Sequence, residues 1–326
     1  MSRANLTVSI ASQIREAETQ EQKQKVLEYY SKESLLKRIL QYGYSPLVTF
    51  GMNDYTTMQK GKPEGMGISK FMHVLEDIYQ NKLVGEEARF ACNIAMNHIN
   101  DEESPIFYQM ITKTMDLGLE IDTINAVWPD LIIKYPLQMA VESTNKMLKD
   151  VEWPASVQEY IHGVRINVIV KNTHVEYRLG DGELMSGLDI YNDAFVKLTQ
   201  NGSTVLDGSL IFIKDGKQVP EVTEEEILSA DPKDLRFTFW DSVRYDGFAS
   251  GKDTRLGYNW RFNGLEHMLM LYEGEEQPPF SLPVTKPVNS LKEAQQFKKE
   301  MKFEKVLIKS YDGIWSNGTT TSELIM

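Results

Sequence analysis

The chain has 326 residues, 41% of them hydrophobic and 25% charged, and a formal net charge of −12. This length is sufficient for two packed cores, and no stretch approaches the roughly 20 apolar residues that a membrane span needs. The N-terminal residues turn acidic before an apolar signal segment develops, so we expect a cytoplasmic protein. The acidic balance opposes indiscriminate nucleic-acid binding, because nonspecific affinity comes mainly from lysine and arginine. A single cysteine, Cys92, excludes an internal disulfide framework and a thiolate metal cluster.

Apolar residues recur at helical spacing from about residue 10 to residue 130. They are Leu35, Leu36, Ile39 and Leu40, then Phe71, Leu75 and Ile78, and finally Phe107, Met110, Ile111 and Met115. Such spacing predicts amphipathic helices that each bury one face. We therefore expect an all-α helical domain over residues 1–135.

The pattern changes between residues 136 and 154, which we interpret as a linker or domain junction. Beyond it, apolar residues alternate with a period of two, which predicts strands. The alternating segments are Ile166–Val170, Val175–Tyr177, Val205–Ile213, Leu235–Phe239 and Val306–Ile308. Helical composition is found at Glu221–Asp231 and Leu291–Met301. Residues 155–326 are thus predicted to form an antiparallel-sheet domain, and the whole chain an α+β fold.

Several segments carry a resemblance to one protein family, and they follow one another in the family's order. They are Glu21–Ile39, Asn125–Ile132, Glu152–Arg165, Tyr177–Gly180, Val205–Phe212, Phe237–Val243, Arg255–Met268 and Phe303–Trp315. In these segments the chain resembles the ATP-dependent DNA ligases of T-even-type bacteriophages. The resemblance implies that residues 1–135 are like the ligase DNA-binding domain and residues 155–326 like its nucleotidyltransferase domain. A phage-encoded protein of this kind is expected in the host cytoplasm.

The segment from Gln158 to Arg165 falls on the family's adenylation motif, Lys-x-Asp-Gly-x-Arg. In the family, the lysine amine attacks the α-phosphate of ATP. Here Tyr160 takes the lysine position and His162 the aspartate position, whereas Gly163 and Arg165 are retained. The rigid phenol of Tyr160 is poorly placed for that attack. A tyrosyl adduct, or His162 as the nucleophile, stays open as a less favoured alternative.

Further positions of the family's motifs are also substituted. Ser209 replaces the glutamate of the acidic Asp-Gly-Glu motif, and Lys305 replaces the glycine of the fourth motif's Glu-Gly pair. No basic residue follows Lys309, so the resemblance leaves no Lys-x-Lys phosphate motif and no OB-fold domain. The stretch Asp181–Leu184 spells the acidic motif too early in the chain, and we interpret it as a hairpin turn. We therefore predict a truncated, degenerate pseudo-ligase that is not an enzyme and has no catalytic residues.

Five residues of the family's nucleotide pocket are retained, namely Arg165, Arg178, Phe237, Glu304 and Lys309. The resemblance assigns Phe237 to adenine and the arginines to ribose or phosphate, which leaves room for weak ATP or AMP binding without a required cofactor. In the alternative that we favour, Phe237 is a core residue, both arginines pair with carboxylates, and Lys309 is solvated. The five histidines show no metal-ligand spacing, so no metal site is predicted.

The substituted motifs favour a protein that acts by binding. A protein partner is preferred to DNA, because the net charge is acidic and the family's DNA clamp is missing. Interference with a host or phage factor that acts on DNA is one form of this hypothesis. Two alternatives stay open: an active nucleotidyltransferase that uses a group other than lysine or transfers AMP to a protein, and a structural component of a virion or replication complex. No membrane partner is expected.

Overall fold

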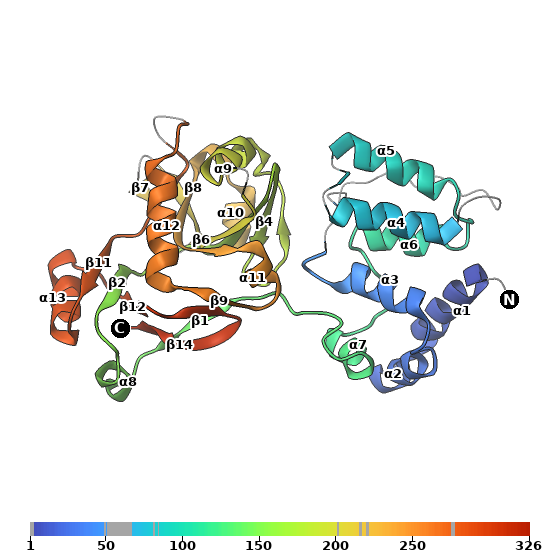
Figure 1. Ribbon diagram of the computed structural model, residues 1–326, viewed down its shortest axis with the longest axis horizontal. Coiled ribbons are helices and arrows are strands. Elements are labelled where there is room, and N and C mark those ends of the chain that lie inside the picture. The colour runs from blue at the N-terminus through green and yellow to red at the C-terminus, as the bar shows by residue number, and fades with distance from the viewer. Residues whose placement is uncertain are drawn as a thin grey trace. The chain divides into compact units, whose positions relative to one another are not determined.

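The computed structural model describes residues 3–48, 50, 67–80, 82–83, 85–200, 202–214, 217–219, 222–274 and 278–326. The chain divides into two compact units, Met1–Lys134 and Tyr135–Met326. The first unit is helical, and the second combines sheets with helices (Figure 1). The predicted α+β fold is thus confirmed. No helix in the described ranges is long and apolar enough to cross a membrane.

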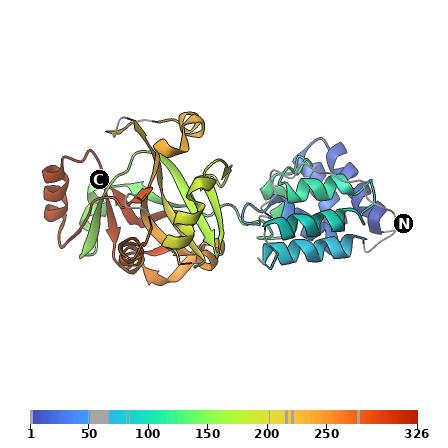
Figure 2. The ribbon, with the colours of Figure 1, turned by 90° about the horizontal axis from the view of Figure 1, so that it is seen from above.

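The first unit is built from helices that bury the predicted apolar positions. The helices are α1 (Arg3–Glu16), α2 (Gln20–Tyr29), α3 (Ser34–Tyr44), α4 (Gly67–Tyr79), α5 (Gly85–Met96), α6 (Ser104–Ile111) and α7 (Ile121–Val127). Helix α4 lies along α5 (Figures 1 and 2), and α3 packs on α6. Phe71 and Leu75 of α4 and Phe107 of α6 are fully buried in one core. The helical spacing therefore identified the buried face of these helices correctly.

The second unit contains two larger sheets and one small one. The five-stranded sheet has the order β1 (Gln138–Glu142), β14 (Gly318–Ile325), β12 (Val306–Ser310), β2 (Ala155–Glu159) and β11 (Thr285–Val288). The seven-stranded sheet has the order β10 (Phe280–Ser281), β8 (Leu235–Arg244), β6 (Thr204–Lys214), β3 (Val164–Lys171), β4 (His174–Leu179) and β5 (Leu184–Met185), with β7 (Lys217–Gln218) beside β6. Strand β9 (Lys252–Gly257) pairs with β13 (Ile314–Ser316). The pairings are antiparallel except for β1 with β14 and β8 with β10, which are parallel.

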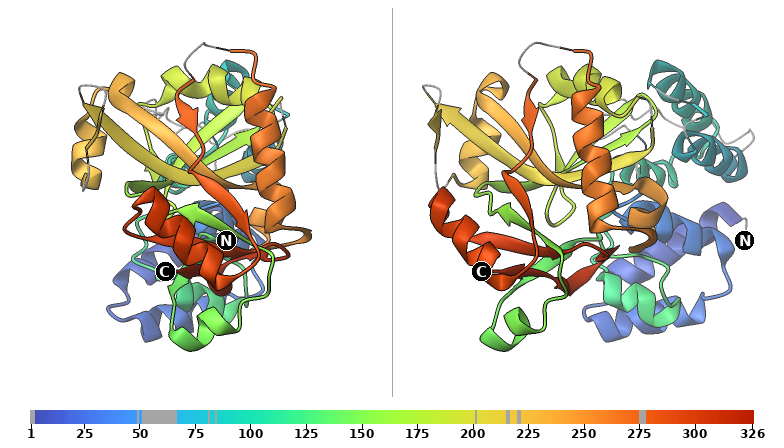
Figure 3. Two further views of the ribbon diagram at one scale, coloured as in Figure 1. Left: turned by 90° about the vertical axis from the view of Figure 1, so that its left-hand side faces the viewer. Right: turned by 60° about the vertical axis from the view of Figure 1, so that its left-hand side comes forward.

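Helices pack on both larger sheets, and each sheet forms its own hydrophobic core with its helices. The helices of this unit are α8 (Asn145–Lys149), α9 (Asn192–Leu198), α10 (Glu224–Ser229), α11 (Tyr245–Ala249), α12 (Tyr258–Met270) and α13 (Leu291–Met301), with short 3-10 turns at Asp189–Tyr191 and Pro232–Asp234. Residues of α9, α10 and α12 share a core with the seven-stranded sheet. Residues of α8 and α13 share another with the five-stranded sheet, and α13 lies at the end of that sheet in Figure 3.

Alternation along β3 gives the seven-stranded sheet one apolar and one polar face. Ile166, Val168 and Val170 point into the core with α9 and α12. Arg165 and Asn167 point the other way, and both donate hydrogen bonds to a carboxylate of β6. The polar face therefore contributes the charged groups of the site described below.

The structure bears on two local predictions, the junction at residues 136–154 and the hairpin turn at Asp181–Leu184. Residues 136–154, predicted as a junction, contribute β1 and α8 to the second unit. The hairpin turn predicted at Asp181–Leu184 is confirmed, because it joins β4 to β5 and the Glu183 amide donates to Asp181 Oδ1 at 2.8 Å. Gly182 has φ +92°, a conformation that glycine adopts without strain.

Candidate functional site

A cavity of about 250 Å³ lies between the two larger sheets, and we call it the inter-sheet cavity. Strands β1, β12 and β14 line it from the five-stranded sheet, and β3, β6 and β8 line it from the seven-stranded sheet. Four of the predicted site residues line this cavity together, namely Tyr160, Arg165, Ser209 and Lys309. The fold therefore gathers groups that lie far apart in the sequence.

Arg165 reaches the inter-sheet cavity from β3 and is held by a carboxylate on the neighbouring strand. Its Nε and Nη2 donate to Asp207 Oδ1 and Oδ2 at 3.1 and 2.6 Å. Asn167 Nδ2 donates to the same carboxylate at 2.9 Å. Because this bidentate pair uses only one edge of the guanidinium, Nη1 has no hydrogen-bond partner among the described residues. Arg165 thus keeps a donor for a ligand.

Trp240 supplies an aromatic ring to the cavity wall. A β-bulge after Asp207 shifts the register of β6 against β8, so that Gly208 lies opposite Phe239 and Trp240 is the additional residue. Bulges commonly re-aim a side chain beside a functional site. The guanidinium carbon of Arg165 lies 5.6 Å from the Trp240 ring centroid. Trp240 was not among the predicted site residues, although alternation with Phe239 already placed it on the opposite face of the strand.

Lys309 is the buried cation of the inter-sheet cavity. Its side chain is 1% exposed, and the register of β12 and β14 places it directly opposite Glu323. Its Nζ lies 3.2 Å from Glu323 Oε1 and 4.6 Å from the centroid of the Tyr258 ring, without a hydrogen bond of acceptable geometry in the described structure. The expectation that Lys309 is solvated is wrong, because the surrounding strands and Tyr258 bury it. Glu323 was not among the predicted site residues. In the sequence it is marked only by the alternation of side chains along β14, which places it on the same face as every second residue of that strand.

Tyr160 lies directly after β2, where its backbone amide donates to the Lys305 carbonyl at 3.3 Å. Its ring meets the His162 ring edge-on, with centroids 5.1 Å apart. Lys305 Nζ lies 5.9 Å from the Tyr160 ring centroid and 3.0 Å from Glu142 Oε1. The hydrogen bond that Lys305 Nζ donates to Glu142 raises the pKa of Lys305. His162 is exposed, and neither His162 nor Lys305 lines the inter-sheet cavity.

Besides His162 and Lys305, three residues of the predicted nucleotide pocket lie away from the inter-sheet cavity. Phe237 is fully buried in the aromatic core of the seven-stranded sheet. Arg178 is buried, with Nη2 3.1 Å from Glu176 Oε2 and Nη1 2.7 Å from the Gly182 carbonyl. Glu304 is exposed. This arrangement fits the alternative in which Phe237 is a core residue and the arginines pair with carboxylates.

Carboxylates balance the cations around the inter-sheet cavity. Asp207 faces Arg165 and Glu323 faces Lys309, so the four charges sum to zero. Within the part of the chain that the structure describes, no group of three or more His, Cys, Asp or Glu side chains is arranged to hold a metal ion. An anionic ligand would therefore share these cations with protein carboxylates.

The chain is similar to known proteins along nearly its whole length. No protein-family model matches it. The DNA ligase of Enterobacteria phage T4 is 23% identical over 370 residues, a match that covers 96% of this chain and 73% of the ligase. The DNA ligase of Enterobacteria phage T6 matches with the same identity and coverage. The chain is homologous to phage DNA ligases.

The chain is also similar to solved structures. The structure named Pmar-Lig_Pre. has a TM-score of 0.50 at 18% identity, with 98% of this chain and 77% of that chain covered. The ATP-dependent DNA ligase from bacteriophage T7 in complex with ATP has a TM-score of 0.44 at 16% identity, with 59% and 68% covered. The first of these similarities shows a shared fold across nearly the whole chain.

The homology corrects one prediction. The sequence analysis predicted that the chain is not an enzyme, but the relatives that match 96% of it are named DNA ligase. Nothing in the described structure shows a loss of activity. The tyrosine at position 160 therefore does not by itself exclude catalysis, and the cavity contains one lysine amine among its described lining residues, that of Lys309.

Proposed function

We propose that the chain is a DNA-ligase-like protein that binds an adenine nucleotide in the inter-sheet cavity and works on DNA in a host cytoplasm. One observation carries the proposal. The buried Lys309 amine lines the cavity without a hydrogen bond of acceptable geometry in the described structure. A buried polar group without such a partner is unfavourable, so a ligand oxygen in the cavity would satisfy it.

The chemistry of the cavity wall suits a nucleotide. The Trp240 ring offers a surface on which a purine can stack, which contributes about 1–3 kcal/mol per base in nucleic-acid complexes. Arg165 Nη1 and Lys309 Nζ can donate to phosphate oxygens. Ser209 adds a hydroxyl to the wall. The volume of about 250 Å³ is slightly below the roughly 300–1,000 Å³ of typical ligand pockets, so we expect it to hold part of the nucleotide.

A second candidate function is covalent nucleotidyl transfer, and the position of Lys309 beside Glu323 favours it. In this step, Lys309 Nζ attacks the α-phosphorus of ATP, the phosphorus–nitrogen bond forms, and the bond to the pyrophosphate oxygen breaks. The amine proton passes to Glu323, whose Oε1 is 3.2 Å away. Nucleophile activation by an adjacent base is a general device of covalent catalysis. The Tyr160 hydroxyl is the competing acceptor.

Nucleotide binding is tested by titrating the full chain with ATP and AMP in a calorimeter. We expect saturable binding that Trp240→Ala and Lys309→Met each weaken, by about tenfold for the loss of one stacked base or charged contact. Glu304→Gln is the matched control, because Glu304 is exposed and lies outside the cavity. Absence of binding, or equal binding by all variants, contradicts the proposal.

Covalent transfer is tested with ATP radiolabelled on the α-phosphate, in the presence of magnesium or manganese, on a denaturing gel. Label on Lys309 is a phosphoramidate and is lost in acid, whereas label on Tyr160 is a phosphodiester and survives. Lys309→Met should remove the label and Tyr160→Phe should keep it. No label on a protein that binds ATP would refute transfer while leaving nucleotide binding intact.

DNA is the macromolecular partner that the homology favours, in place of the protein partner preferred from sequence alone. Gel shifts with nicked duplex at about 50 and about 200 mM salt measure it, because phosphate contacts weaken steeply over that range. We expect binding at the lower salt that declines at the higher. If nicked DNA fails to bind at either salt while a protein is captured stoichiometrically from infected cells, the proposed partner is wrong.

A further inference from the structure

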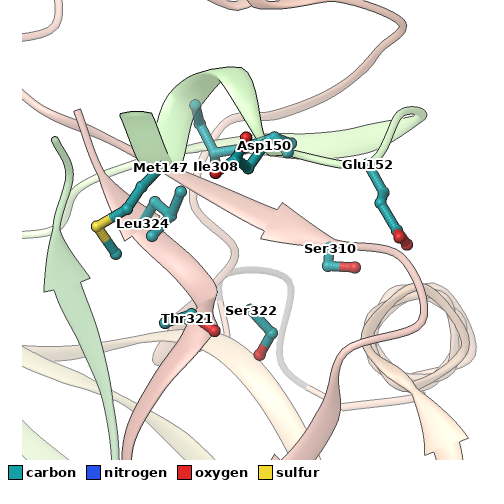
Figure 4. A pocket seen from close by; sticks show the side chains of 9 residues that line it. Met147, Asp150, Glu152, Ile308, Ser310, Thr321, Ser322 and Leu324 are labelled. Atoms are coloured by element: carbon teal, nitrogen blue, oxygen red, sulfur yellow. The ribbon is translucent and has the colours of Figure 1, made fainter. Parts of the chain in front are cut away.

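The five-stranded sheet separates the inter-sheet cavity from a second cavity, of about 410 Å³, on its other face. Figure 4 shows this second cavity, with Ile308 and Ser310 of β12 and the carboxylates of Asp150 and Glu152 along its wall. Successive residues of a strand point to opposite faces, so Lys309, between Ile308 and Ser310, points to the inter-sheet cavity. The Lys309 amine is therefore offered to a ligand in the inter-sheet cavity and not to one in the second cavity.

Glu323 shares the wall of the inter-sheet cavity with Lys309, from the neighbouring strand β14. The two residues are directly opposite in the register, and the Glu323 side chain is 10% exposed. Its Oε1 lies 3.2 Å from Lys309 Nζ. A ligand oxygen at a hydrogen-bond distance of about 3 Å from this amine is then at most about 6 Å from the carboxylate oxygen. Charges this close interact appreciably in a buried site, so Glu323 acts on any anion that Lys309 binds.

The cations of the inter-sheet cavity are compensated by carboxylates. Among its described lining residues the basic side chains are Arg165 and Lys309, which face Asp207 and Glu323 respectively. Burial lowers the pKa of Arg165, but the charge and hydrogen bonds of Asp207, together with the charge of Glu323, raise it above its ordinary value. The Glu323 carboxylate therefore acts on both cations that a phosphate group would contact.

A third cation lies beside the cavity and is compensated as well. Lys305 Nζ is 5.9 Å from the ring centroid of Tyr160, which lines the cavity. The same Nζ donates to Glu142 Oε1 at 3.0 Å. These three lysine and arginine side chains are thus matched by three carboxylates, and the charges of the described groups around the cavity sum to zero.

We propose that the inter-sheet cavity is specific for a nucleoside monophosphate, AMP in the case of adenine, and that Glu323 sets this specificity by repelling the further phosphates of a triphosphate. The inference rests on the nucleotide binding proposed above. One phosphate group can accept from the two donors that have no hydrogen bond of acceptable geometry in the described structure, Lys309 Nζ and Arg165 Nη1.

A second and a third phosphate group lack this compensation. Each would add negative charge near Glu323 without a further cation among the described lining residues. The volume of about 250 Å³, slightly below that of typical ligand pockets, also favours the shorter ligand. Rejection of a competing ligand by a like charge is a general means of specificity. ATP should therefore bind more weakly than AMP, but still measurably.

The experiment titrates the full chain with adenosine, AMP, ADP and ATP in a calorimeter. A chelator is present, because a bound metal ion would neutralise part of the ATP charge. We expect the affinity to be highest for AMP. Adenosine lacks the phosphate that Lys309 and Arg165 contact, whereas ADP and ATP carry charge that Glu323 repels.

Three variants separate charge from packing. Glu323→Gln should raise the ATP affinity at least about tenfold, which is about 1.4 kcal/mol, and the AMP affinity by a smaller factor. Glu323→Asp keeps the charge and should keep the preference for AMP. Glu266→Gln, an exposed change on α12, should leave all four affinities unaltered. If Glu323→Gln does not fold, the series on the unmodified chain and on Glu323→Asp still decides.

Each outcome bears on the proposal. An affinity that rises with every added phosphate group, or a ratio of AMP to ATP affinity that Glu323→Gln leaves unchanged, would overturn the role of Glu323 while nucleotide binding stands. Loss of the AMP preference in Glu323→Asp would also overturn it, because the charge is still present. If none of the four ligands binds to a protein whose melting temperature is normal, nucleotide binding itself fails, and this inference fails with it.

Discussion

The buried ion pair between Asp241 and Arg261 gives the sharpest stability prediction. Arg261 Nε and Nη2 donate to the two oxygens of Asp241 at 2.9 and 2.8 Å, and both side chains are 2% exposed. Arg261 Nη1 also donates to the carbonyls of Leu256 and Gly313 at 2.8 and 3.0 Å. Asp241 is the neighbour of Trp240, so the pair fixes one wall of the inter-sheet cavity.

Asp241→Asn keeps the side-chain volume but leaves the Arg261 charge buried and uncompensated. Breaking such a pair by removing one partner costs about 3–5 kcal/mol. With a urea dependence of about 2–3 kcal/mol per molar for a unit of this size, the unfolding midpoint of the second unit should fall by about 1–2 M. Replacing both partners, with Asp241→Leu and Arg261→Met, should cost less than Asp241→Asn alone.

Urea unfolding followed by tryptophan fluorescence measures these changes. Lys305→Gln is the control, because its exposed pair with Glu142 contributes at most about 1 kcal/mol. If Asp241→Asn lowers the midpoint no more than Lys305→Gln does, the reasoning about the buried charge is refuted.

Further predictions concern five other positions. Burial raises the pKa of Glu103 to about 7, so the folded state holds a proton that the unfolded state releases near its ordinary value of 4.5. Stability of the first unit should therefore fall as the pH rises through this interval, and Glu103→Gln should flatten that dependence in thermal melts at about pH 5 and about pH 8. A Cβ on Gly208 would meet the Thr238 carbonyl oxygen at 2.3 Å, so Gly208→Ala should destabilise by about 1–3 kcal/mol. Gly264→Ala in α12, where a Cβ meets nothing, should stabilise by up to about 1 kcal/mol in the same urea assay, and destabilisation there would argue against the packing described. Phe237→Ala should cost about 3–5 kcal/mol of stability. Trp240→Ala should mainly lower the nucleotide affinity that calorimetry measures. If Phe237→Ala weakens nucleotide binding instead, and Trp240→Ala lowers the melting temperature, then Phe237 and not Trp240 contacts the nucleotide.

Local patterns predicted most of the secondary structure. The helix at Leu291–Met301 was predicted with its observed bounds, and the hairpin of β3 and β4 followed from alternation. These features depend on neighbours in the chain, because helical and extended backbones repeat over a few residues. The strand β1 within residues 136–154 was not predicted from the sequence, since β1 is short and pairs with a strand distant in the chain, β14.

The candidate site was only partly predictable. The order of the motifs selected Tyr160, Arg165, Ser209 and Lys309, which the fold brings to one cavity. Periodicity says which face of a strand a residue occupies, but it does not say what lies across from that face. Glu323 beside Lys309 and the bulge that adds Trp240 both come from pairing between strands.

The sequence by itself determined the α+β class, the family resemblance and the substitution of tyrosine at position 160. Only the tertiary structure decided that Lys309 is buried, that Trp240 rather than Phe237 faces the cavity, and that Asp150 and Glu152 line a second cavity. The physical reason is that burial and charge pairing are properties of segments distant in the chain, and these segments meet only when the sheets form.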